Sequence, residues 1–135
     1  MSDFNSRIIE EFRENHGRVG GPFEGAPLLL LHSVGAKSGS PRISPVMYLA
    51  DGEKYYVFAS KAGAPTNPAW YHNLVANPEA TIEVGDDTID VVAHEVTGSE
   101  RDAVYGRQAA LYPGFAEYET RTARTIPVVA LVPKL

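Results

Sequence analysis

The sequence predicts a predominantly β protein of the α+β or all-β class, with about six strands in a barrel and short flanking helices. Two observations carry this prediction. Most β-like segments are joined by hairpin signals, which favour antiparallel neighbours. Few helical segments alternate singly with strands, as the βαβ units of a doubly wound sheet require. The 135 residues are expected to form one domain (1–135), in which 1–26 is an N-terminal helix and connector.

The N-terminal helix is expected over residues 3–16. Phe4, Ile8 and Phe12 recur at four-residue spacing on one helical face, and Gly17 is a natural stop before a Gly-rich connector. Three glutamates on this helix would repel anionic lipid, so packing against the domain is favoured over binding to a membrane surface.

Three strands are expected next. Leu28–Leu31 is a continuous apolar run, typical of a strand buried on both faces. The second run, 43–49, contains Pro45, which indicates a strand edge or a bulge. The third run, 55–60, is aromatic and β-branched and follows Asp51-Gly52, a two-residue hairpin signal.

The rest of the chain is expected to mix short helices with one hairpin and a final strand. Asn67 suits an N-cap and Pro68 the first helical position, so a helix should begin there and end at Asn77-Pro78. The elements expected after it are strands 81–84 and 88–91, a helix from a capping box at Thr97 to about Leu111, a helix over 117–122 and a strand over 126–132.

Composition limits the classes of protein that the chain can belong to. Hydrophobic residues make up 44% and charged residues 21%, as in ordinary globular proteins. Without cysteine there is no disulfide, thiolate nucleophile or Cys-based metal site, and the four histidines lack metal-ligand spacing. We see neither a signal peptide nor an apolar run of transmembrane length, and therefore expect a cytoplasmic protein.

The turn between the first two strands, 35–42, is a candidate anion site. It combines two glycines, two serines, Lys37 and Arg42, so backbone N–H groups and fixed charge could form a cradle. The net charge of −5 argues against non-specific nucleic-acid binding, and the basic residues near this turn suit a small anion better. The phosphate-loop pattern fails because Leu31 stands where it needs glycine. From the turn alone, a solvated hairpin end is about as good an interpretation.

Other candidate residues have equally plain structural interpretations. Lys61 ends the third strand and could reach the same anion, or it could lie in water. Tyr112, Phe115 and Tyr118 recur every three residues around the Pro113-Gly114 break. They could belong to the core or cap a flat ligand. Core packing explains Trp70 better than it explains Asn73. We find no nucleophile elbow and no Ser/His/Asp set, so hydrolysis has little support.

Four blocks of the chain, in order and at compatible distances, resemble the deazaflavin (F420)-dependent nitroreductase and quinone reductase family. They are GAKSGSPRISPVMY (35–48), ASKAGA (59–64), NPAWYHNL (67–74) with Asn77-Pro78, and TIPVV (125–129). The resemblance implies a split β-barrel that binds reduced coenzyme F420 (8-hydroxy-5-deazaflavin). It further implies hydride transfer to a quinone or a similar planar acceptor such as a nitroaromatic compound.

The resemblance also implies roles for individual residues. Phosphate and the acidic tail would be held by Lys37, Ser38 and Arg42, with backbone from Ala36 and Gly39. The ring and ribityl portion would be lined by Ser44, Pro45, Met47, Phe58, Ala59, Ser60 and Lys61, with close backbone approach at Gly63. The short helix would close the site with Ala69, Trp70 and Asn73. The acceptor pocket would be formed by Tyr112, Phe115 and Tyr118, with Ser60 or a tyrosine hydroxyl near the reacting atoms.

Met47 and Phe115 stand where the best-known nitroreductase of the family carries tyrosines, so the pocket is expected to be less polar and nitroimidazole reduction is in question. Two alternatives stay open: an FMN-binding split-barrel oxidoreductase, and a non-catalytic carrier of deazaflavin or a lipophile. We expect a monomer with no nucleic-acid partner and no transmembrane segment. Peripheral contact with the inner face of the cell membrane stays open. The proton could come from Ser60, Tyr112, Tyr118 or solvent.

Overall fold

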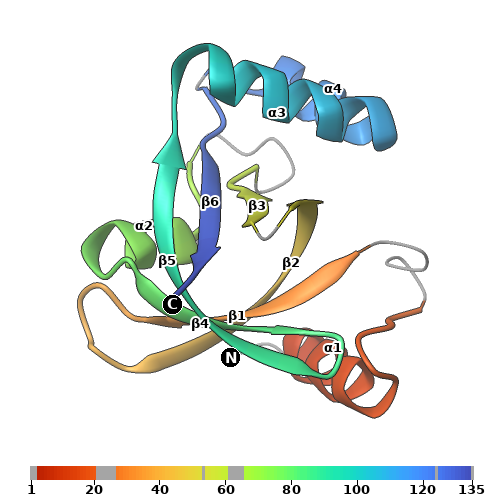
Figure 1. Cartoon of the computed structure of the whole chain (residues 1–135), viewed down its shortest axis with the longest axis vertical. Helices are drawn as coiled ribbons and strands as arrows, with labels where there is room; N and C mark the ends of the chain where they lie inside the picture. The colour runs from red at the N-terminus through yellow and green to blue at the C-terminus, as the bar shows by residue number, and fades with distance from the viewer. Residues whose placement is uncertain (1–2, 21–26, 53, 61–65, 124, 135) are drawn as a thin grey trace.

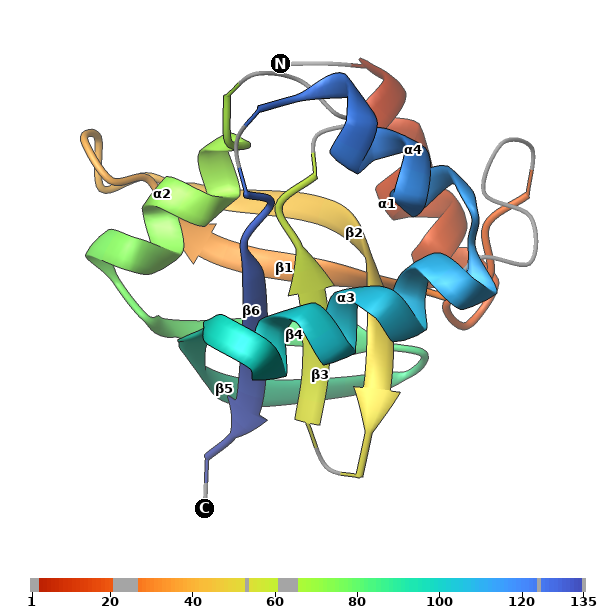
Figure 2. The ribbon, with the colours of Figure 1, turned by 90° about the horizontal axis from the view of Figure 1, so that it is seen from above.

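The computed structural model describes residues 3–20, 27–52, 54–60, 66–123 and 125–134. These residues form a closed antiparallel barrel in the strand order β1-β2-β3-β6-β5-β4, with short helices around it (Figures 1 and 2). The strands are β1 (Leu28–Val34), β2 (Pro41–Asp51), β3 (Lys54–Phe58), β4 (Glu79–Val84), β5 (Asp87–Val96) and β6 (Val128–Pro133). The helices are α1 (Asp3–Glu14), α2 (Ala69–Ala76), α3 (Gly98–Leu111) and α4 (Gly114–Arg121). The predicted antiparallel barrel is confirmed.

Strand β2 changes its neighbour half-way along its length. Its first part, 41–47, pairs with β1, and its last part, 48–51, pairs with β3. Pro45 lies opposite Leu30 in the first part, where β2 pairs only with β1. Pro45 has no N–H to donate, and at this point β2 has no hydrogen-bonded neighbour on the β3 side, so no sheet hydrogen bond is lost there. The prediction of a strand edge at Pro45 is confirmed.

The strands have a different apolar layer on each face. Inside the barrel, Leu29 and Leu31 pack with Val57, Ile82 and further residues of the other strands. The outer faces of β3 and β6 pack under α3 and α4, and Leu28 and Leu30 pack against α1. Figure 1 shows α3 and α4 at one end of the molecule and α1 at the opposite end. The continuous leucine run is thus explained by burial on both faces of β1.

Several element boundaries differ from the predictions. Helix α2 begins at Ala69, because Pro68 has an extended ψ of 156° and is itself the N-cap. Thr97 is the N-cap of α3, but its side chain makes no capping hydrogen bond, so the predicted capping box is wrong in that detail. Asp51 pairs with Lys54, so the β2–β3 turn starts one residue later, at Gly52 with φ of 62°. Helix α4 begins three residues earlier than predicted.

Among the described residues, no helix is both long and apolar enough to cross a bilayer.

Candidate functional site

A groove of about 820 Å³ runs along the first part of β2. One border is the β1–β2 turn with α2, and another is α1. The lining residues are Gly35, Ala36, Lys37, Ser38, Pro41, Arg42, Ile43 and Ser44 from the turn and β2, Ala69, Trp70, His72 and Asn73 from α2, and Ser6 and Ile9 from α1. The groove therefore brings together eight of the residues assigned to the site from the sequence.

The charge of this groove has one sign. Lys37 and Arg42 are exposed and line it, and the described residues that line it include no aspartate or glutamate. The whole chain, by contrast, carries a net charge of −5. A concave site with fixed positive charge and no nearby carboxylate attracts small anions, because field lines are focused in the groove.

The β1–β2 turn has a compact backbone that depends on Gly35. The Gly35 N–H donates to the Ser40 carbonyl at 2.8 Å, and the Gly39 N–H donates to the Gly35 carbonyl at 2.9 Å. The Ser40 N–H donates to Ser38 Oγ at 3.2 Å. A Cβ at Gly35 would lie 2.6 Å from that same Ser38 Oγ. Glycine at this position therefore leaves room for Ser38 Oγ to accept from the Ser40 N–H.

Asn73 joins this turn to α2. Its Oδ1 accepts the Ala36 N–H at 2.9 Å, and its Nδ2 donates to Ser33 Oγ at 3.3 Å. Asn73 and Ser33 are both buried. Since a buried amide that loses its partners is costly, these two bonds hold the turn in place relative to the helix. These hydrogen bonds explain why the polar residue Asn73 occupies a position that core packing alone does not explain.

Helix α2 is itself fixed against the barrel. Trp70 and Leu74 belong to the interior core, and the Tyr71 hydroxyl donates to Glu95 Oε1 on β5 at 2.6 Å. Burial, and then this hydrogen bond to Glu95, raise the pKa of Tyr71 to about 12. The Tyr71–Glu95 hydrogen bond and the apolar packing of Trp70 and Leu74 thus hold α2 against the barrel as one wall of the groove.

The residues assigned to the acceptor pocket lie in a different apolar cluster, under α3 and α4. Phe115 is buried there, with its ring centroid 5.7 Å from that of Phe58 and 5.2 Å from that of Tyr118. The Tyr105 hydroxyl donates to the Phe115 carbonyl at 2.7 Å. Met47 and Tyr112 pack against the same cluster. Phe115 is therefore a packed core residue, and its contact with an acceptor stays a prediction.

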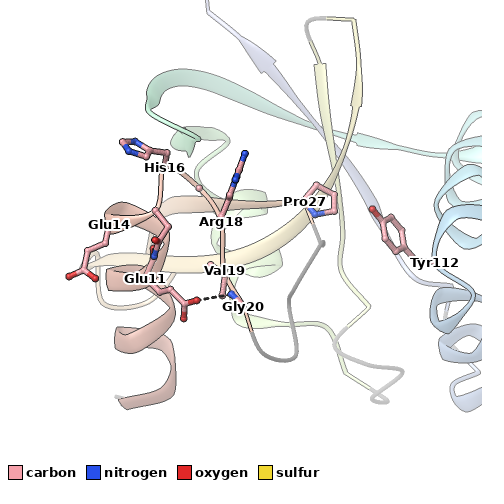
Figure 3. A pocket seen from close by; sticks show the side chains of 10 residues that line it. Glu11, Glu14, His16, Arg18, Val19, Gly20, Pro27 and Tyr112 are labelled. Carbon is pink, nitrogen blue, oxygen red and sulfur yellow. Dashed lines mark hydrogen bonds between the residues drawn. The ribbon is translucent and has the colours of Figure 1, made fainter.

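Tyr112 also lines a second cavity, of about 1280 Å³. Figure 3 shows Tyr112 on the opposite side of this cavity from the end of α1, with Pro27 between Tyr112 and the helix. Burial, followed by the neighbouring Tyr55 and Tyr112, raises the pKa of Tyr48 above its ordinary value of 10.0. Met47 of β2 and Tyr112 at the end of α3 pack against the same apolar cluster, an association that no local sequence pattern predicts.

The remaining predicted residues are not among those that line the groove. Gly39 lies in the turn with φ of 71°, Pro45 in β2, and Ala59 in the barrel interior. Ser60 is buried two residues after the end of β3. Lys61 and Gly63 fall outside the described residues. The predicted anion end of the site is thus gathered in one groove, whereas the ring and acceptor ends stay predictions.

Sequence reasoning missed the residues that α1 adds to the groove. Ser6 and Ile9 line it, yet neither belongs to the apolar stripe of three residues, at four-residue spacing, that predicted the helix. His72 on α2 was also missed as a lining residue. Only the tertiary position of α1 beside β2 reveals the role of Ser6 and Ile9, because nothing in the local sequence distinguishes them.

Comparisons with known proteins identify the family of the chain. The family model described as F420H(2)-dependent quinone reductase matches residues 6–133. The F420H(2)-dependent quinone reductase Rv1261c of Mycobacterium tuberculosis is 41% identical over 126 residues, which cover 89% of this chain and 83% of that protein.

Two solved structures are similar along most of the chain. One is an F420-H2 dependent reductase (FDR-A), with a TM-score of 0.71 and 40% identity, covering 78% of this chain and 93% of that one. The other is described as a domain-swapped dimer, with a TM-score of 0.74 and 36% identity, covering 96% and 97%. The barrel is thus of the split type found in F420 reductases. Together these matches show that the chain belongs to the F420H(2)-dependent quinone reductase family of oxidoreductases.

Proposed function

We propose that this protein transfers a hydride from reduced coenzyme F420 to a quinone. The observation that carries the proposal is the charge of the groove, where Lys37 and Arg42 face no carboxylate among the described lining residues. The coenzyme carries a phosphate and an acidic tail, for which such a groove is electrostatically suited. When bound, the reduced coenzyme supplies the hydride, so the protein needs no metal and no covalent nucleophile.

The donor set of the groove fits the anionic part of the coenzyme. Lys37 and Arg42 would form charge-assisted hydrogen bonds with phosphate and carboxylate oxygens. Ser38 and the backbone of the turn would add neutral donors, and Trp70 would offer an apolar face beside them. Because Asn73 holds the turn against α2, these donors are organised before the coenzyme arrives, which reduces the entropic cost of binding.

The acceptor side would be formed by residues from β3 and the α3–α4 junction. Ser60 would line the ring together with Met47, Phe58 and Ala59. Tyr112 and Tyr118, with Phe115 between them in sequence, would place a flat acceptor. As the quinone takes up a hydride, a proton must reach its oxygen to give the hydroquinone; Ser60 Oγ, either tyrosine hydroxyl or solvent would deliver it.

The acceptor that we propose is a quinone, and a nitroaromatic compound would be a slower alternative. Phe115 has no hydroxyl group that could hydrogen-bond to a nitro group, which supports a quinone as the better acceptor. We further propose that the protein works as a cytoplasmic monomer and meets lipophilic quinones by peripheral contact at the inner face of the membrane.

The test is oxidation of reduced coenzyme F420 by purified protein with menadione as the acceptor. We expect oxidation to require both protein and menadione, and we expect the oxidised coenzyme to bind while FMN does not. Retention of FMN with no affinity for F420 would instead support a flavin enzyme. Binding of F420 without turnover, with menadione or a longer-chain quinone, would support a carrier. Either result would contradict the proposal.

A further inference from the structure

Helix α1 borders the groove although it lies far from the turn in sequence. Ser6 and Ile9 are among the lining residues. On its inner side, Ile8 and Phe12 are buried against Leu28 and Leu30 of β1, and Ile9 packs against the same cluster. The helix that covers the outside of β1 therefore also supplies one border of the cofactor groove, so its position determines the width of that groove.

In addition to this apolar packing, a carboxylate outside the groove ties α1 to the barrel. Glu83 on β4 accepts two hydrogen bonds from Arg13, at 3.1 Å from Nε and 2.7 Å from Nη2. Its Oε2 also lies 2.5 Å from His32 Nε2 on β1. The Glu83 side chain is only 17% exposed. A bidentate pair of this kind fixes orientation as well as distance, because two of the three guanidinium nitrogens are engaged.

The residues that follow α1 pack closely against the β4–β5 turn. A Cβ at Gly17 would lie 2.8 Å from the Cα of Gly85, so the two backbones approach as only glycine allows. His16 Nδ1 lies 2.7 Å from Asp86 Oδ1. The Gly20 N–H donates to Glu11 Oε2 at 2.6 Å, as the dashed line in Figure 3 shows. These contacts place the end of α1, and the Arg13–Glu83 pair sets the orientation of the helix that precedes it.

We propose that α1 is a wall of the cofactor groove and that Glu83, through Arg13, is the positioning residue that keeps this wall in place. The proposal rests on the proposed function, because the ligand it concerns is coenzyme F420. Among the described residues, the hydrogen-bond partners of the Glu83 side chain are Arg13 and His32, neither of which lines the groove, so its effect must be transmitted by α1. Loss of the ion pair would let α1 leave its docked position part of the time and lower the fraction of binding-competent protein.

The first test replaces Glu83 by glutamine in the full chain and measures coenzyme F420 affinity by fluorescence titration. We expect the dissociation constant to rise several-fold and no further, because Arg13 is 49% exposed and solvent partly screens the pair. Turnover at saturating coenzyme should change little, since binding restores the docked state. Arg13→Gln should give the same rise, and the double variant should be no worse than either single one. Arg13→Lys should recover part of the affinity.

Two matched controls separate this effect from loss of charge alone. Glu79→Gln removes a carboxylate from the same strand, where the partner is Lys134 and not α1, and should leave the affinity unchanged. Ile9→Glu places a negative charge on the proposed wall and should weaken binding. Arg7→Gln makes the same change in net charge on α1, at an exposed position that does not line the groove, and should weaken it much less.

A second readout is hydrogen exchange of α1 with and without coenzyme. We expect slower exchange of α1 when the coenzyme binds, and faster exchange in free Glu83→Gln than in the free wild type. Wild-type affinity in both Glu83→Gln and Arg13→Gln would overturn the inference while leaving the proposed function intact. A weakened Glu83→Gln with no effect of Ile9→Glu would also overturn it. Absence of F420 binding by the wild type would instead refute the proposed function, and this inference with it.

Discussion

Asn73 is the residue on which the shape of the anion site depends most. Its amide accepts from the Ala36 N–H and donates to Ser33, so it uses both ends of the side chain to connect α2 with the β1–β2 turn. Lys37 and Arg42 extend from that turn into the groove. Charge at the site therefore comes from two exposed residues, whereas its placement comes from a buried neutral one.

Replacing Asn73 by alanine should affect both stability and binding. The Ala36 N–H and Ser33 Oγ would lose their partner, which should lower the free energy of unfolding by about 1–3 kcal/mol. Coenzyme affinity should also fall, because the turn is no longer held against α2. Urea denaturation and fluorescence titration measure the two effects. Asn77→Ala, at the exposed end of the same helix, is the control and should change stability by less than about 0.5 kcal/mol. An Asn73→Ala protein equal to the wild type in both respects would disprove this role.

Tyr118→Phe tests the acceptor side at the level of one hydroxyl group. The ring contact with Phe115 is kept, so the fold should be retained. We expect a lower turnover number with menadione and an almost unchanged affinity for coenzyme F420, because the hydroxyl is assigned to the acceptor. Steady-state kinetics and coenzyme titration distinguish these quantities. Equal losses in both would argue against an acceptor-side role for Tyr118.

At the scale of elements, the β1–β2 turn and α2 act as one unit. The turn is closed by backbone bonds between Gly35, Gly39 and Ser40, and α2 is fixed by Tyr71 and by its apolar face in the barrel. The sequence predicted both elements, because a Gly-Ser-rich turn and an Asn-Pro helix start are local signals. It did not predict their connection through Asn73, since Ser33 and Ala36 are about 40 residues away in the chain.

Gly35→Ala should disturb this unit while leaving the barrel intact. The new Cβ would lie 2.6 Å from Ser38 Oγ, so Ser38 must move and lose its bond from the Ser40 N–H. We expect a several-fold weaker affinity for coenzyme F420 and a loss of stability of about 1 kcal/mol. Gly106→Ala, on α3 where a Cβ meets nothing, is the matched control and should stabilise the protein by roughly 0.5–1 kcal/mol. Unchanged affinity in Gly35→Ala would show that the shape of the turn does not matter.

Across the whole molecule, the split of β2 between two neighbours creates the groove. The first part of β2 pairs only with β1, so its other edge is available to α1 and α2. Hairpin signals predicted the strands and Pro45 predicted the edge, because both act over a few residues. The contribution of α1 could not be predicted, since Ser6 and Ile9 reach the groove only through the tertiary packing of Ile8 and Phe12 on β1.

The Arg13–Glu83 ion pair should also make stability depend on pH. Hydrogen bonding from Arg13, opposed by burial and assisted by His32, lowers the pKa of Glu83 below its ordinary value of 4.5. A carboxyl group whose pKa is lower in the folded state stabilises the protein above the unfolded pKa, and this contribution is lost as pH falls through the folded pKa.

Between about pH 5 and pH 3, the wild type should therefore lose stability more steeply than Glu83→Gln. Urea denaturation at a series of pH values measures this slope. Parallel curves for the two proteins would show that the ion pair does not contribute to acid sensitivity.

The most direct measurement of the central claim is the affinity for coenzyme F420 of a double variant, Lys37→Ala with Arg42→Ala. Both side chains are exposed, so the fold should be retained, and each lost charge-assisted contact should cost about 1.5–3 kcal/mol of binding free energy. The account predicts that binding falls by at least two orders of magnitude and that wild-type binding weakens with added salt. A folded double variant that binds coenzyme F420 as tightly as the wild type would contradict it.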